Sequence, residues 1–94
     1  NSTINLKWNK ELIVDNYMIH YKKSIPSFDT NQTKILYTDN NYFSFDVVDQ
    51  TNNSATNTND DSYILDDNSE YNFKIYGLNS FGIYSTSNII SIKT

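Results

Sequence analysis

The 94-residue chain has no cysteine, a single histidine, a single proline and only two glycines. Without cysteine it can form neither a disulfide framework nor a thiolate metal site. Two glycines are too few for a glycine-rich phosphate loop. One histidine without cysteine leaves no zinc site of the usual type and no Ser-His-Asp triad. We therefore expect no catalytic activity, no metal and no cofactor.

Positive charge is also scarce. All seven basic residues are lysines, they form no cluster, and the net charge is −4. Phosphate binding needs concentrated lysine and arginine, so we expect neither nucleic acid nor an anionic membrane as a partner. No apolar run approaches the roughly 20 residues of a transmembrane helix, so we expect no direct membrane insertion. No signal peptide is visible, as expected of a module taken from a longer protein.

What the chain does contain is alternation of apolar and polar residues, which predicts strands. The pattern covers residues 2–8, 16–23, 33–37, 42–48, 62–65, 71–78 and 87–93. The residues predicted to face inward are Ile4, Leu6, Trp8, Tyr17, Ile19, Tyr21, Phe43, Phe45, Val47, Tyr71, Phe73, Ile75, Ile90 and Ile92. A chain of this length is one domain, residues 1–94, and these strands make its fold class all-β.

The most informative stretch is 63–79, which is predicted to form a strand, a tight corner and a second strand. Leu65 lies six residues before Tyr71, with a polar turn at 66–70 between them. This is the spacing of a tyrosine corner, in which the ring packs into the core and the hydroxyl bonds to backbone a few residues upstream. The spacing predicts a two-sheet β-sandwich.

The same stretch resembles the fibronectin type III family. That family typically shows Leu-x-Pro-x-Thr-x-Tyr followed by x-Phe-x-Val-x-Ala-x-Asn-x-x-Gly. The matching residues here are Leu65, Ser69, Tyr71, Phe73, Ile75, Asn79 and Gly82. Asp67 stands where the family usually has Pro, and Gly77 where it usually has Ala. The resemblance extends from Trp8 to Thr94, and so covers nearly the whole chain.

The resemblance implies an antiparallel sandwich in which strands B (2–8) and E (62–65) lie opposite strands C (16–23), C′ (33–37), F and G. The family has a strand A about ten residues ahead of strand B, and the chain starts too late to hold one. Either residues upstream supply that strand, or another chain pairs with the open edge from Ile4 to Trp8.

Two segments lie outside this minimal set of strands. Residues 42–48 are predicted to form either a hairpin with strand C′ or a strand that runs on toward strand E. Residues 49–61 are rich in Asn and Thr and contain no apolar residue larger than Ala55. Such a segment cannot repay its ordering entropy, so we predict a flexible C′–E loop, with a binding loop that orders on contact as the alternative.

Partner binding is predicted at two loops, B–C (9–15) and F–G (79–84). The candidate residues of the second are Asn79, Ser80, Phe81, Ile83 and Tyr84. Exposed aromatic side chains are favoured interface anchors. The alternative is that Phe81 and Tyr84 cover the end of the core or a neighbouring domain.

Other chemistry-bearing residues have plainer interpretations. His20 is predicted to be a solvated surface residue, and Trp8 a core residue rather than a ligand-stacking one. Carboxylates gather at 60–61 and 66–70, where we expect a solvated acidic face rather than a calcium site. Three triplets match the N-glycosylation acceptor pattern, at Asn1, Asn31 and Asn52, which favours an extracellular or cell-surface address.

Together these features predict a non-enzymatic protein-interaction or adhesion module of a larger cell-surface or secreted protein. Its expected partner is another protein. Two alternatives remain open. One is a passive spacer in a secreted multidomain enzyme or adhesin. The other is a self-association module of a membrane-associated assembly.

Overall fold

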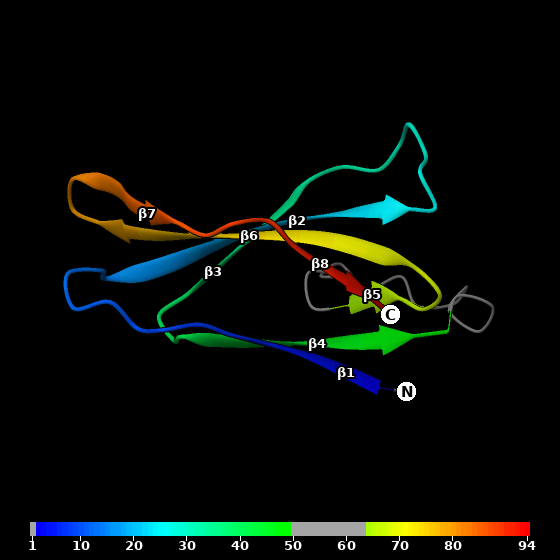
Figure 1. Ribbon diagram of the computed structural model, residues 1–94, viewed down its shortest axis with the longest axis horizontal. Coiled ribbons are helices and arrows are strands. Elements are labelled where there is room, and N and C mark those ends of the chain that lie inside the picture. The colour runs from blue at the N-terminus through cyan, green and yellow to red at the C-terminus, as the bar shows by residue number, and fades with distance from the viewer. Residues whose placement is uncertain (1, 50–63) are drawn as a thin grey trace.

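Figure 1 shows the computed structural model of the chain, which describes residues 2–49 and 64–94. All the regular structure in these two segments is β-strand, which confirms the all-β prediction. The strands are β1 (Ser2–Lys7), β2 (Asn16–Ile25), β3 (Lys34–Thr38), β4 (Tyr42–Val48), β5 (Ile64–Asp66), β6 (Glu70–Asn79), β7 (Gly82–Thr86) and β8 (Ile90–Lys93).

The strands form two sheets that pack face to face as a β-sandwich. One sheet has the order β1-β4-β5, and the other has the order β3-β2-β6, with β7 and β8 pairing successive parts of β6. Alternate side chains from both sheets meet in the core, as the strand period requires. The buried core residues are Leu6, Val14, Tyr17, Ile19, Tyr21, Leu36, Phe45, Val47, Leu65, Tyr71, Phe73 and Ile75.

Tyr71 fixes the corner between β5 and β6. Its ring is buried, and its hydroxyl accepts a hydrogen bond from the backbone N–H of Asp66 over 2.8 Å. Asn68, between them, adopts the left-handed conformation with φ 50°, which asparagine tolerates in tight turns. The bond predicted from the spacing of Leu65 and Tyr71 is confirmed. Burial raises the pKa of Tyr71 to about 12, since the phenolate would lose its hydration.

The Tyr71→Phe variant is expected to lose about 1–3 kcal/mol of unfolding free energy, because the Asp66 N–H loses its acceptor. The folded state also holds the Tyr71 proton more tightly than the unfolded state, whose tyrosine pKa is near 10. This contribution is therefore complete below pH 10 and falls as the pH rises toward 12. Urea unfolding across this range should show the stability difference between wild type and variant narrowing. A difference independent of pH would contradict the buried hydroxyl.

Two strand assignments differ from the prediction. The strand that pairs with β1 is β4, in antiparallel register from Ser2 opposite Val47 to Lys7 opposite Tyr42. The segment predicted as strand E is described only as the three-residue β5, which lies parallel to β4 on its far edge. A parallel pair needs a crossover of a dozen or more residues, and residues 49–63 supply that length. The sandwich is therefore mixed rather than purely antiparallel.

The last predicted strand, 87–93, is formed only over β8, and β7 is an additional strand that begins within the predicted F–G loop. Ser87 separates the two strands, because its backbone N–H donates to Ile75 O over 2.8 Å and its Oγ accepts the Ile75 N–H over 2.9 Å. A side-chain oxygen thus takes a position that a strand carbonyl would hold. Ile92 packs against the core as predicted, whereas Ile90 remains 36% exposed, so the predicted inward pair is half correct.

The outer edge of β1 has no neighbouring strand within residues 2–49 and 64–94. The N–H of Trp8 bonds to Asn41 O on the β4 side, so alternation points the backbone groups of Thr3, Asn5 and Lys7 away from β4. The predicted flexible loop at 49–61 falls almost entirely outside the described residues. In the described part of the chain there is no helix of the length and apolar character needed to cross a membrane.

Candidate functional site

Two segments far apart in sequence meet at one end of the sandwich. Figure 1 shows the β6–β7 hairpin beside the connection from β1 to β2 at this end. Leu12 and Phe81, one from each segment, are 103% and 97% exposed, and they are accompanied by side chains that are more than half exposed. We name this group the apolar end surface, and its members are Leu12, Ile13, Phe81, Ile83 and Tyr84.

Local backbone chemistry directs Phe81 outward. The loop between β6 and β7 consists of Ser80 and Phe81 alone, shorter than the predicted 79–84. Asn79 Oδ1 accepts the Phe81 N–H over 2.9 Å, and Gly82 follows with φ +117°, a conformation that favours glycine. The hairpin is therefore tight, and its tip side chain projects into solvent. The alternative that Phe81 covers the end of this core is wrong.

A bulge in the hairpin brings two consecutive apolar residues onto one site. Ser85 pairs with Gly77 and Ile83 pairs with Leu78, so Tyr84 is the extra residue on β7. A bulge re-aims a side chain that strict alternation would send to the opposite face. Ile83 and Tyr84 accordingly both line the same hollow.

That hollow, about 550 Å³ in volume, lies between the two segments. Its walls are Ile13, Asp15, Asn79, Ser80, Phe81, Ile83 and Tyr84. The five residues predicted for the F–G loop are all among them, and the predicted B–C loop contributes Ile13 and Asp15. Asp15 is the one ionisable group of this set apart from the phenol of Tyr84. A mostly apolar hollow with few polar groups is the usual form of a binding site.

Hydrogen bonds hold the two segments in place. Asn79 Nδ2 donates to Ile13 O over 3.3 Å, and the Asp15 N–H donates to Leu78 O over 2.7 Å. On the inner side, the Glu11 N–H donates to the Tyr17 hydroxyl over 2.8 Å. The apolar end surface is therefore attached to the sandwich at several points. Its backbone should lose little conformational entropy on binding.

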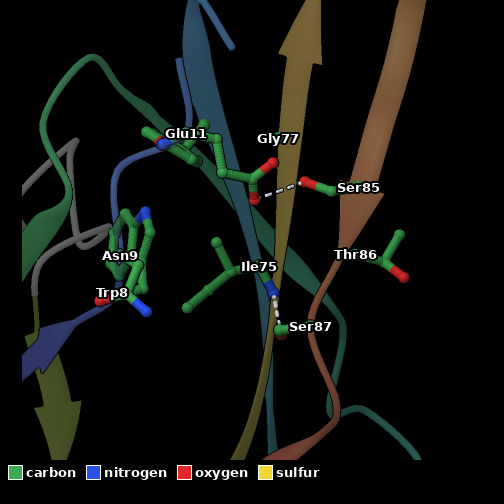
Figure 2. Close-up of a pocket in the computed structure, with 9 residues that line it drawn as sticks. Trp8, Asn9, Glu11, Ile75, Gly77, Ser85, Thr86 and Ser87 are labelled. Carbon is green, nitrogen blue, oxygen red and sulfur yellow. Dashed lines mark hydrogen bonds between the residues drawn. The ribbon is translucent and has the colours of Figure 1, made fainter. Parts of the chain in front are cut away.

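A second, smaller hollow of about 160 Å³ is lined by residues of the β1–β2 connection, β2, β6 and β7 (Figure 2). Glu11 reaches across it, and its Oε1 accepts a hydrogen bond from Ser85 Oγ over 2.8 Å. The other lining residues are Trp8, Asn9, Tyr17, Ile75, Gly77, Thr86 and Ser87. Ser85 and Glu11 bond to each other and Ser87 Oγ accepts the Ile75 N–H, whereas Trp8 Nε1 is buried without a hydrogen-bond partner among the described residues. The bond between Glu11 and Ser85 anchors the β1–β2 connection to β7.

Gly77 makes this anchoring geometrically feasible. A Cβ at this position would lie 2.6 Å from Ser85 Oγ and 2.9 Å from Val14 Cγ2. Val14 is buried in the core, so it cannot easily move aside. The glycine that stands where the resembled family usually has alanine is thus explained by the close approach of the β1–β2 connection.

The Gly77→Ala variant is expected to lose about 1–3 kcal/mol of unfolding free energy through overpacking. Ser85 must turn away from the new methyl group, so the bond to Glu11 should also be lost. Urea unfolding measures the first effect, and the backbone amide chemical shifts of Glu11 and Val14 report the second. Removing the Ser85 hydroxyl as well, in Gly77→Ala/Ser85→Ala, should recover part of the stability. A single variant as stable as wild type would contradict the contact.

A further exposed group lies on the outer face of the five-stranded sheet, and the sequence reasoning did not identify it. Tyr37 on β3 is 61% exposed. Met18 on β2 lies between Tyr37 and its other cross-strand neighbour, Tyr76 on β6. His20 packs on Tyr76 with ring centroids 4.6 Å apart, and its Nε2 is buried without a hydrogen-bond partner among the described residues. His20 therefore lies on the outward face as predicted, but it is half-buried and its Nε2 is shielded from solvent. The available signal was the run Ile35-Leu36-Tyr37, which is apolar on both faces.

The remaining predicted sites are placed as follows. Trp8 packs against Tyr17 with ring centroids 5.4 Å apart and contacts the core, as predicted. Asp66 forms an ion pair with Lys23, and no group of three or more His, Asp or Glu within the described segments is arranged to hold a metal. Asp60 and Asp61 lie outside those segments.

Of the three glycosylation candidates, the structure describes Asn31. Its Nδ2 donates to Lys23 O over 3.2 Å and to Pro26 O over 3.0 Å. A sugar on Nδ2 would replace one of the two hydrogens that these bonds use. Asn1 and Asn52 lie outside the described residues, and glycosylation stays a prediction.

Comparisons with known proteins were made for the whole sequence. No family model, curated protein or solved structure matches it.

Proposed function

We propose that the chain is a non-enzymatic interaction module that resembles fibronectin type III domains, in a larger cell-surface or secreted protein. Its partner is another protein, bound through the apolar end surface. The observation that carries this proposal is the full exposure of Phe81 and Leu12 beside an apolar hollow, on elements that hydrogen bonds hold in place.

The size of the surface supports a protein partner. A large apolar side chain carries roughly 150–200 Å² of surface, so the apolar end surface exposes on the order of 600 Å². This is the upper end of what a monomeric protein usually leaves exposed in one patch. It also approaches the roughly 800 Å² that each side contributes to a standard protein–protein interface.

The resemblance to fibronectin type III domains is supported by the order of the pairings. β1 corresponds to strand B, β2 and β3 to strands C and C′, and β6 with β7 and β8 to strands F and G. In the place of strand E beside β1, β4 is found rather than the predicted segment 62–65. The Tyr71–Asp66 bond occupies the expected corner. The extracellular or cell-surface address and the glycosylation belong to the same proposal.

A pull-down from surface extracts of the source organism tests the proposal. The wild-type domain should retain a partner that the Phe81→Ala/Tyr84→Ala variant loses, at matched melting temperature. Identical, empty pull-downs would favour the passive-spacer alternative.

A second candidate function is association through strand addition at β1. The observation that favours it is the outer edge of β1, which pairs with none of the described strands and whose backbone at Thr3, Asn5 and Lys7 points away from β4. An extended segment could add there by main-chain hydrogen bonds. Sedimentation should then show a mass that rises with concentration, and a constant monomer mass would exclude pairing between copies.

A further inference from the structure

We propose that the partner segment bound at the apolar end surface presents a basic side chain, lysine or arginine, next to apolar residues. Asp15 is the residue that selects the basic group. This inference rests on the proposed function and names the chemical class of the partner. It follows from the place of one carboxylate in an otherwise uncharged hollow.

Asp15 is exposed and lines the hollow together with apolar side chains. Its backbone is held by the bond from its N–H to Leu78 O, so the carboxylate has a defined place at the start of β2. Among the residues that the structure describes, no lysine is found within 4.0 Å of the Asp15 carboxylate. In the free domain this carboxylate is exposed to water.

Docking would remove that water. A segment that fills the hollow and covers Ile13, Phe81 and Ile83 also covers the Asp15 carboxylate. Burying an ionised carboxylate without a partner is strongly unfavourable. A tightly bound segment must therefore bring a cation to Asp15 along with its apolar side chains. Arginine fits best, because its planar guanidinium can bond the carboxylate in two places and stack on a ring such as Tyr84.

The same carboxylate argues against two other occupants. A second copy docked symmetrically would use the same patch, so it would add a second Asp15 carboxylate to the interface, and the residues that line the hollow include no lysine to balance it. Each copy also carries a net charge of −4. A bilayer would take up Leu12 and Phe81, but its apolar interior would offer Asp15 no counter-charge. The other charged residues of the β1–β2 connection are Lys10 and Glu11, whose opposite charges sum to zero, so Asp15 determines the net charge of this segment.

The test is selection from a random heptapeptide library displayed on phage, with three immobilised baits. These are the wild-type domain, Asp15→Asn and Phe81→Ala, each checked for an unchanged melting temperature. Wild type should enrich peptides in which Lys or Arg neighbours Leu, Ile, Phe or Trp. Asp15→Asn should enrich apolar peptides without the basic residue, and Phe81→Ala should enrich none.

Affinity then measures the contribution of Asp15. The most enriched wild-type peptide should bind Asp15→Asn at least about tenfold more weakly by calorimetry, which corresponds to 1.4 kcal/mol. The loss should shrink when the peptide's basic residue is replaced by citrulline or norleucine.

The outcomes separate the two proposals. Apolar peptides without basic residues, lost on Phe81→Ala, would overturn the role of Asp15 and leave the proposed function intact. Peptides that bind Phe81→Ala as well as wild type, or no enrichment at all, would overturn both. Self-association of wild type, or its binding to phosphatidylcholine vesicles, that disappears in Phe81→Ala would replace the basic segment with a second copy or a lipid surface.

Discussion

The Phe73→Ala variant is expected to lose about 3–5 kcal/mol of unfolding free energy, the largest effect on stability among the substitutions considered. Phe73 is fully buried between the sheets. Its ring stacks on Tyr21 with centroids 5.7 Å apart and meets Phe45, from the opposite sheet, at 5.4 Å. Removing it opens a cavity at the contact between the two layers. The total unfolding free energy of a domain is roughly 5–15 kcal/mol, so the variant should be partly unfolded at 37 °C.

Urea unfolding followed by the fluorescence of Trp8, the single tryptophan, measures this loss. Phe81→Ala is the matched control, since it deletes the same side chain from an exposed position. We expect the control to change stability by less than about 0.5 kcal/mol. Equal losses in the two variants would contradict the assignment of Phe73 to the core and Phe81 to the surface.

Phe81→Ala is expected to weaken partner binding by at least about 30-fold, or roughly 2 kcal/mol, while leaving the domain folded. An aromatic side chain that projects at the centre of an apolar surface is the usual position of an interface anchor. Its 97% exposure means that no internal contact is lost when it is truncated. The measurement is the affinity of the wild-type and variant domains for the captured partner.

The control for binding is Ile89→Ala. Ile89 is also a large exposed apolar residue, at 64%, but it lies between β7 and β8, away from the hairpin tip. Its truncation should leave the affinity within about twofold, that is about 0.4 kcal/mol. If both variants weaken binding equally, general surface hydrophobicity rather than the apolar end surface carries the interaction.

Much of the fold could be predicted from the sequence because two signals are local. Alternation of residues such as Tyr17, Ile19 and Tyr21 determines which side of a strand is buried, and the structure buries all three. The spacing of Leu65 and Tyr71 determined the corner, because the Tyr71 hydroxyl can reach only backbone a few residues upstream. Neither signal depends on which strands become neighbours.

The errors arise where a pairing partner or a deviation from regular geometry decides the outcome. Alternation is the same in parallel and antiparallel strands, so it could not show that β5 runs parallel to β4. The bulge at Tyr84 depends on the register between β6 and β7, and the side chain of Ser87 ends the regular pairing after β7 by bonding to Ile75. Alternation along the sequence does not predict the packed outer face around His20, because it assigns outward positions to solvent.

The sequence predicts which residues form the candidate site, but not how their side chains are oriented. The F–G loop was identified from its large apolar residues, yet whether Phe81 faced the core or solvent could not be decided from them. That choice depends on the positive φ of Gly82 and the turn bond of Asn79. The role proposed for Asp15 depends on the fold, which brings the β1–β2 connection beside the hairpin.

Hydrogen–deuterium exchange of the domain, with and without the partner captured from surface extracts, tests the central claim most directly. We predict that protection on binding concentrates in residues 10–15 and 79–84, the two segments that carry the apolar end surface. Protection confined to the outer edge of β1, or to the face of β2, β3 and β6 around His20, would contradict the claim and place recognition on another surface of the sandwich.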